Sequence, residues 1–503
     1  MRRSTSWSRA SSGELLKVGL VLLLLAGCAT RDAKPVSTAP QKVTLFFSAE
    51  VRGYLGPCGC SENMRGAISR SAFQIAEARK AGGAVHFFDC GDGLFGEAGL
   101  PEEAVPQQER KARALADAWK AMGLDLRAPG PLDDARGPAF RQGLQLPELA
   151  DGAFKVLDGV GVINAPTPAA AAALAVAARK AGARFVVAMV PLPFEVLLRE
   201  ARDAGEVDLF VSARAKDTLA AEDSKWAGGT TRVAQVQSRG RSLLRVDVFL
   251  HDGGRVQWLR GDGERDRELY ALDQRIELLR AQVNEPMLQD ELKALRKAKL
   301  EEIISRRELL AQAPLPVPEG KAAATARFIP LESTFPKDPA VQAVEKAYDV
   351  DVGLINLAWA KENGKACPPA TPEQRGYVGS PRCVSCHEES EPVFKGSKHA
   401  RAYATLSGEG KQYHLDCVAC HVTGWQQPQG VCRIDQTTGR EEVGCESCHG
   451  PGDTHSKSPA AGNIVRFVEA KTCKTCHDRE NSPNFDFDTY VPKILGPGHG
   501  HHK

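Results

Sequence analysis

Short apolar runs alternate with helical periodicity between residues 43 and 261. The apolar runs predict buried strands, and segments whose apolar residues recur every three or four positions predict helices. Helices are expected at Ile68–Ala81 and Ala169–Ala181. The predicted strands are Val43–Ser48, Val85–Asp89, Lys155–Asn164, Arg184–Val190, Val207–Ser212 and Leu243–Leu250. This alternation predicts an α/β layered domain over residues 43–262.

A different pattern follows, in which apolar residues step by three and four, as in a helix that packs on another helix. The stepping residues are Leu269, Leu272, Ile276, Leu279 and Val283. Asn284-Glu285-Pro286 interrupts this stripe, and a second stripe begins with Leu288, Leu292 and Leu295. Residues 263–313 are therefore predicted to form an antiparallel helical hairpin, with one long kinked helix as the alternative.

Residues 314–375 are predicted to be a linker that carries one docking helix. Proline cannot continue a helix, so the hairpin is expected to end at Pro314, Pro316 and Pro318. Asp338–Asn363 has helical periodicity, and its apolar positions predict docking on a neighbouring domain: Val341, Val344, Val352, Ile355 and Leu357. From Tyr377 onward the chain is rich in Cys, His and Gly, which predicts a mainly helical, loop-rich region over residues 376–503.

The first 28 residues have the three parts of a bacterial export signal. Arg2, Arg3, Arg9 and Lys17 are basic, Val18–Ala26 is a short apolar run, and Leu25-Ala26-Gly27-Cys28 resembles a lipoprotein lipobox. We expect residues 1–27 to be removed and Cys28 to be acylated, which would anchor the protein at the periplasmic face of a bacterial membrane or at the outer membrane. An ordinary cleaved signal is the alternative. Residues 28–42 would then form a polar tether.

The cysteines are concentrated near the C-terminal end. Ten of the 14 follow residue 360, and eight of those ten belong to CxxCH motifs. In such a motif two thiols can form thioethers with the haem vinyl groups while the adjacent histidine binds the iron. Zinc ribbons also use paired cysteines, but they do not require a histidine after every second one. Four covalently attached haems c are therefore predicted, at Cys383-Val-Ser-Cys386-His387, Cys417-Val-Ala-Cys420-His421, Cys445-Glu-Ser-Cys448-His449 and Cys473-Lys-Thr-Cys476-His477.

Residues 376–503 are too few to build an ordinary apolar core around four cofactors. The haems themselves are therefore expected to form the core, packed against one another. Two imidazoles saturate a haem iron, whereas a vacant face can bind a small molecule. The histidines available as distal ligands are His399, His455 and His414, with His499, His501 and His502 in the tail.

Residues 376–456 resemble the tetrahaem cytochrome c-554 family. The matching residues are Cys383–His387 with Ser397-Lys398-His399-Ala400, then Cys420-His421-Val422-Thr423-Gly424, and then Cys445–Gly452 with His455. The resemblance implies three haems with two axial histidines and one five-coordinate haem, arranged in stacked pairs. It identifies no electron donor.

Residues 43–250 look like the calcineurin-like metallophosphatase domain of bacterial 5′-nucleotidases. Phe47–Tyr54, Asp89–Asp92, Gly130–Asp133 and Asp208–Lys216 stand where that family has its metal-binding motifs. Two-metal chemistry needs several Asp, His and Asn ligands, yet only Asp92 matches unchanged. The other positions hold Arg52, Pro131, Leu132, Arg214 and Lys216. We therefore predict a metal-free relic, in which Arg52 or Arg214 pairs with Glu50 and Asp92 in place of the ions.

Five further cysteines lie outside the signal and the haem motifs. Cys58, Cys60 and Cys90 follow successive predicted strands, and the ends of parallel strands share one sheet edge. A disulfide between Cys90 and one of the other two is expected, with a thiolate metal site as the alternative. Cys367 and Cys432 are a second candidate pair.

Three functions are consistent with these patterns. The first is electron transfer between redox partner proteins by a lipid-anchored tetrahaem cytochrome that has no catalytic residues and uses the α/β domain for docking. The second is an oxidoreductase that acts on a small nitrogen or oxygen species at a five-coordinate haem. The third, a 5′-nucleotidase-like phosphohydrolase, is disfavoured by the lost metal ligands. The net charge of +2 argues against a general attraction to nucleic acid.

Overall fold

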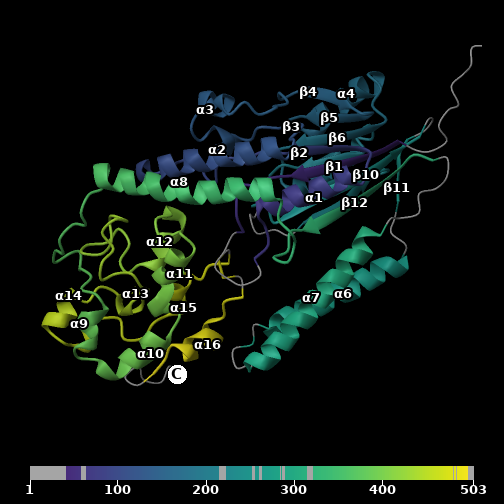
Figure 1. The fold of residues 1–503 in the computed structure, drawn as a ribbon. Coiled ribbons are helices and arrows are strands. Elements are labelled where there is room, and N and C mark those ends of the chain that lie inside the picture. Colours follow the sequence, from purple (N-terminus) through teal and green to yellow (C-terminus); the bar gives the residue numbers. More distant parts are fainter. Residues whose placement is uncertain are drawn as a thin grey trace, which may run out of the picture. The chain divides into compact units, whose positions relative to one another are not determined.

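A computed structural model of the chain describes most residues after position 40 (Figure 1). The described residues are 41–57, 64–214, 222–251, 255–259, 263–283, 285, 289–313, 321–479, 481–482 and 484–496. Cys28 and the predicted signal lie outside these ranges. No helix within them is long and apolar enough to span a bilayer.

The first of two mixed sheets contains the N-terminal strand of the domain. Its order is β11-β12-β10-β1-β2-β3. The strands are β1 (Gln41–Ser48), β2 (Ala84–Asp89), β3 (Leu126–Arg127), β10 (Ser242–Leu250), β11 (Gln257–Trp258) and β12 (Ala323–Pro330). β1 pairs in parallel with β2 and antiparallel with β10, which pairs in turn with β12. The range predicted as a linker therefore contributes a strand to this sheet.

The second sheet has the order β4-β5-β6-β7-β9-β8. Its strands are β4 (Ala153–Leu157), β5 (Val160–Asn164), β6 (Phe185–Val190), β7 (Leu209–Ser212), β8 (Asp223–Gly228) and β9 (Thr231–Gln235). The single strand predicted over residues 155–164 is wrong, because Asp158 and Gly159 both have positive φ, 47° and 81°, and turn the chain into a hairpin. Consecutive positive φ values are typical of tight hairpin turns at Asp-Gly.

The two sheets pack face to face, and helices cover their outer faces. One apolar core lies between the sheets, with Phe47 from β1 and Val187 from β6 among its fully buried residues. A second core joins the first sheet to α1 (Ile68–Lys80), α2 (Val105–Ala121) and α8 (Pro339–Asn363). A third joins the second sheet to α4 (Pro168–Lys180) and α5 (Phe194–Glu200). The short helix α3 (Pro138–Gly143) follows β3. The α/β layered domain predicted from the sequence is confirmed.

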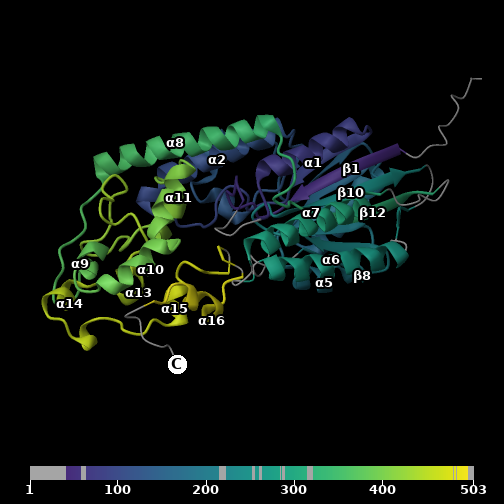
Figure 2. The same ribbon diagram turned by 60° about the horizontal axis from the view of Figure 1, so that its bottom comes forward.

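The two segments with apolar stripes form α6 (Gly263–Val283) and α7 (Asp290–Gln312), which lie side by side as the predicted hairpin (Figures 1 and 2). Ile276 and Val283 of α6 pack on Leu300 and Ile304 of α7. The predicted docking helix is α8, which lies along α2 in both views. Val341 and Val352 of α8 are buried in the second core.

The C-terminal region consists of short helices joined by loops. Its helices are α9 (Ser380–Val384), α10 (Glu391–Gly396), α11 (Ala402–Gly408), α12 (Leu415–His421), α13 (Cys445–His449), α14 (Asp453–Lys457), α15 (Ala470–Cys473) and α16 (Phe487–Tyr490). Its one apolar cluster within the described residues is small and centres on Val418, Val422, Val431 and Ile434.

Candidate haem-binding site

Each CxxCH motif begins on a short helix. α9, α12, α13 and α15 carry the first cysteine of the four motifs, at Cys383, Cys417, Cys445 and Cys473. The amide of His387 donates to the carbonyl of Cys383, and that of His477 to the carbonyl of Cys473, at 3.0 and 2.8 Å. This single helical turn brings the histidine to the face that bears the first cysteine. The local structure thus presents two thiols and an imidazole together, as haem attachment requires.

A cavity lies between the motifs. Its walls include Cys383, Cys445, Cys448 and Cys473 from three different motifs, together with His399. Apolar side chains complete the lining: Val384, Phe394, Val443, Val468, Val491, Ile494 and Leu495. An apolar space with convergent thiols and imidazoles fits a haem.

Several of these histidines are oriented by hydrogen bonds at Nδ1. The Nδ1 of His421 lies 2.7 Å from the carbonyl oxygen of Ala402, and that of His449 lies 2.7 Å from the carbonyl oxygen of Val465. In His477 the Nδ1 contacts Ser482 Oγ at 2.9 Å. A carbonyl oxygen can only accept, so it fixes the proton at Nδ1 of His421 and His449 and leaves Nε2 as the nitrogen that can bind a metal. The Ser482 hydroxyl can donate or accept, so it orients the His477 ring without fixing its tautomer.

Two pairs of imidazoles face each other at a separation that fits one iron. The ring centres of His387 and His455 are 6.4 Å apart, and those of His399 and His477 are 6.1 Å apart. Metal–imidazole bonds of about 2 Å on opposite sides of one metal would separate the ring centres by roughly 6 Å. Burial lowers the pKa values of His399 and His477, which favours the neutral imidazole that binds metals.

His414 is held differently. Its Nε2 lies 3.1 Å from the carbonyl oxygen of Asp349 in α8, and its ring meets that of Tyr348 edge-on at 5.8 Å. It is 4% exposed. The nitrogen that serves the other histidines as a metal-binding atom is thus occupied here. The tail histidines His499, His501 and His502 lie outside the described residues.

Cysteines of different motifs also approach one another. An interaction with the Cys383 thiol lowers the pKa of Cys445 to about 7, and an interaction with Cys420 lowers that of Cys476 to about 6. Motifs one and three are therefore neighbours, as are motifs two and four.

The edge of the α/β domain where metallophosphatases bind their ions carries arginines. The predicted Arg52–Glu50 ion pair is confirmed, with an N–O distance of 2.8 Å. Asp92 accepts a hydrogen bond from the Leu132 amide at 2.8 Å, and the charge of Arg214 opposes the upward shift that burial imposes on the pKa of Asp92. Glu50, Arg52 and Asp92 all have φ near +50°, a strained backbone conformation for residues other than glycine. Lys216 lies outside the described residues.

Sequence reasoning missed the buried charge network beneath this edge. Arg127 of β3 has no exposed surface, and its guanidinium lies 2.6 Å from Asp133 and 3.6 Å from Asp89, which are also fully buried. Asp133 accepts hydrogen bonds from the amides of Asp92, Gly93, Leu94 and Gly130. Burial raises the pKa of Asp89 to about 7. This role of Arg127 could not be predicted from the sequence, because β3 has only two residues and therefore shows no periodic pattern.

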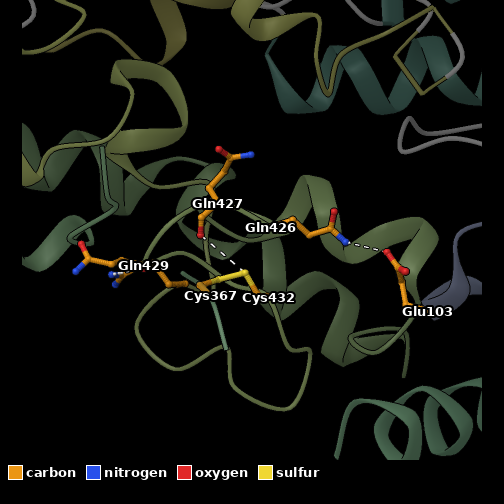
Figure 3. The surroundings of a disulfide bond; sticks show 7 residues. Glu103, Cys367, Gln426, Gln427, Gln429 and Cys432 are labelled. Atoms are coloured by element: carbon orange, nitrogen blue, oxygen red, sulfur yellow. Dashed lines mark hydrogen bonds between the residues drawn. A yellow bond between two sulfur atoms is a disulfide. The ribbon is translucent and has the colours of Figure 1, made fainter. Parts of the chain in front are cut away.

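The remaining cysteines differ in state. Cys367 and Cys432 form a disulfide, which joins the segment after α8 to the loop after the second motif (Figure 3). Cys90 is buried and has no disulfide partner among the described residues. Its proposed partners, Cys58 and Cys60, lie outside the described residues.

The α/β part of the chain is similar to two solved structures from Thermus thermophilus. The first is a 5′-nucleotidase precursor that is 14% identical with a TM-score of 0.38, over 65% of this chain and 61% of that one. The second is the sulfate thiohydrolase SoxB, 13% identical with a TM-score of 0.39, over 70% of this chain and 67% of that one.

The C-terminal region matches c-type cytochromes. Residues 382–450 match the family described as cytochrome c554 and c-prime. Cytochrome c-554 of Nitrosomonas europaea is 35% identical over an alignment of 143 residues, and the match covers 21% of this chain and 60% of that protein. The match thus spans less than two thirds of the relative. The C-terminal region resembles the cytochrome c-554 family.

Proposed function

We propose that this protein is an extracytoplasmic electron carrier with four haems c, attached at its four CxxCH motifs. The observation that carries the proposal is the shared cavity, which is lined by cysteines of three motifs and by His399. Haem supplies a reversible one-electron centre when it is bound. The chain supplies the thiols that hold it and the imidazoles that set its orientation. Haems held by motifs that line one apolar cavity would be neighbours, and they could then exchange electrons without large movements of the protein.

The histidine pairs support an assignment of axial ligands. We assign His387 and His455 to the haem of the first motif, and His399 and His477 to that of the fourth, because both separations fit one iron. His421 and His449 would bind the other two irons through Nε2.

Haem content tests the proposal directly. Full-length protein produced with a haem-attachment system should contain four covalently bound haems, measured by mass spectrometry and by the reduced pyridine haemochrome spectrum. A mutant with Cys445 and Cys448 changed to alanine should contain three. A protein without covalent haem would overturn the proposal.

A second candidate function is an oxidoreductase that binds a small nitrogen or oxygen species at a five-coordinate haem. The observation that favours it is the environment of His414, whose Nε2 contacts the Asp349 carbonyl. Beyond the motifs, the described C-terminal residues include only His399 and His455 as other distal candidates. Nitric oxide or cyanide should shift a high-spin fraction of the visible spectrum if one iron is open. A spectrum unchanged by both ligands would leave the carrier function alone.

For the α/β domain we propose a docking role without phosphatase chemistry. The positive charges of Arg52 and Arg214 disfavour binding of a divalent cation at these positions, because like charges repel. The full-length protein should bind less than one equivalent of Mn²⁺ in its α/β domain and should not hydrolyse nucleotides. Two bound equivalents, or measurable hydrolysis, would contradict this role.

We further propose that acylation of Cys28 anchors the chain to a membrane. The lipobox-like Leu25-Ala26-Gly27-Cys28 supports this. Cys28→Ser should move the protein from the membrane fraction to the soluble periplasmic fraction with its haem content unchanged. Retention of the variant in membranes would refute the anchor.

A further inference from the structure

The α/β domain contacts the segment that carries the second CxxCH motif. Gln107 of α2 accepts two hydrogen bonds at Oε1, from the amide of Leu415 at 3.0 Å and from Asn356 Nδ2 of α8 at 2.6 Å. Asn356 Nδ2 also donates to the carbonyl oxygen of Tyr413 at 2.8 Å. Gln107 and Asn356 are buried. Two helices that pack on the first sheet therefore fix the start of α12, which contains Cys417, Cys420 and His421.

The next turn of α2 adds an ion pair. Lys111 Nζ lies 2.6 Å from Asp416 Oδ2, and Gln108 Nε2 lies 3.3 Å from Asp416 Oδ1. The Lys111 side chain is 12% exposed and that of Asp416 is 45% exposed. Lys111 also lies over the ring of Tyr54, 5.7 Å from its centre. Asp416 immediately precedes Cys417, so this pair is the nearest charge in sequence to the second haem attachment site.

The far end of the same segment is held as well. Gln426 Nε2 lies 3.2 Å from Glu103 Oε1, in the short helix before α2 (Figure 3). Contacts with the α/β domain thus occur on both sides of the second motif, at Leu415–Asp416 and at Gln426. A segment held at both ends keeps a fixed position relative to Lys111.

We infer that Lys111 of the phosphatase-like domain sets the reduction potential of the haem attached at Cys417 and Cys420, by neutralising Asp416. This inference rests on the proposed function. An unpaired carboxylate beside a haem favours the oxidised iron, which carries one more positive charge, whereas an unpaired ammonium favours the reduced iron. The domain would then be a positioning and charge-setting part of the electron carrier in addition to a docking module.

The two halves of the pair give opposite predictions. Lys111→Met should lower the midpoint potential of one haem, and Asp416→Asn should raise it. Each should change the ratio of oxidised to reduced haem at a fixed potential by about three- to tenfold, measured by spectroscopic redox titration of the full-length protein at neutral pH. The double variant should return close to the original potential, and the other haems should keep theirs.

Arg110→Met is the matched control. Arg110 is the neighbouring residue of α2 and forms an ion pair with Asp351 of α8 at 2.7 Å, so its loss removes the same charge from α2 and leaves the Lys111–Asp416 pair in place. Shifts of the same sign in Lys111→Met and Asp416→Asn would mean that loosening of the contact between α2 and α12 causes the effect, and an equal shift in Arg110→Met would mean that any positive charge of α2 has it; either result would overturn the inference. Four haems with unaltered potentials in all variants would overturn it too, while leaving electron transfer intact. A protein without haem would instead refute the proposed function.

Discussion

At the scale of single residues, Arg127 is the most consequential charge in the α/β domain. Its guanidinium is enclosed by Asp89 and Asp133 and stacks over Trp119 at 5.3 Å. Asp133 in turn holds the amides of the loop after β2. The strained residue Asp92 is joined to this network, because its amide donates to Asp133, and the amide of Arg52 donates to the carbonyl oxygen of Asp92. A fixed cation thus stabilises the buried carboxylates at this edge of the sheet.

Arg127→Met should therefore destabilise the domain strongly. Removing one partner from a buried ion pair leaves uncompensated carboxylates, which costs about 3–5 kcal/mol. The free energy of unfolding from denaturant titration, followed by tryptophan fluorescence, measures the loss. Arg136→Met is the matched control, since the Arg136–Glu109 pair is 39% and 29% exposed and such pairs contribute only about 0–1 kcal/mol. Similar losses in both variants would show that the network has no special role.

His86 makes stability depend on pH. Its Nδ1 lies 3.0 Å from Asp125 and its Nε2 lies 2.9 Å from Asp158. Burial lowers the pKa of His86, but the two carboxylates outweigh burial and raise it. A raised pKa in the folded state stabilises the protein fully below the unfolded pKa of about 6.5, and this stabilisation is lost as pH rises through the folded pKa.

His86→Gln should thus cost more stability at about pH 6 than at about pH 9. The measurement is the difference in melting temperature between the original protein and the variant across that range. Asp89, whose pKa is about 7, titrates in both proteins and cancels in the difference. A difference that does not vary with pH would show that folding leaves the pKa of His86 unchanged, and a larger cost at high pH would show that folding lowers it.

At the scale of elements, the strength of the sequence signal decided what could be predicted. α1, α4, the hairpin of α6 and α7, and α8 follow from long periodic patterns. β12 (Ala323–Pro330) was missed because Ala323-Ala324-Thr325-Ala326 is weakly apolar, and its pairing with β10 supplies the stabilisation. The haem motifs could be recognised in the sequence because covalent attachment of haem requires a fixed spacing of the two cysteines and the histidine. The close approach of the His387 and His455 rings depends on tertiary structure, so no local sequence pattern predicts it.

The Cys367–Cys432 disulfide should stabilise the C-terminal region considerably. It closes a loop of 65 residues, and restriction of the unfolded chain by a loop of this length contributes about 4 kcal/mol. The double variant Cys367→Ser/Cys432→Ser should therefore unfold at lower denaturant concentration, followed by the haem absorbance. Reductant should destabilise the original protein and leave the variant unchanged. Equal sensitivity of both proteins to reductant would refute this contribution.

At the scale of the whole molecule, the α/β domain buries far more apolar side chains than the described residues after 376 do. The α/β domain has three extensive cores within and around its two sheets. Among the described residues after 376, six apolar side chains are buried: Leu406, Val418, Val422, Val431, Ile434 and Val491. A region of that length cannot offset the entropy of chain ordering with so little apolar burial. We therefore expect its fold to depend on the haems that are proposed to bind there.

Protein produced without haem attachment should show that the α/β domain and the C-terminal region differ in whether they need haem to fold. The α/β domain should fold, because its cores are complete without a cofactor, whereas the C-terminal region should be open to proteases. Limited proteolysis under reducing conditions, followed by mass spectrometry, should yield a protected fragment that ends between α8 and α9, near residues 364–380. The haem-containing protein should resist cleavage there under the same conditions, which makes it the control. Equal protection of the C-terminal region in both forms would mean that the polypeptide folds there without haem, and that the haems bind to a structure that is already formed.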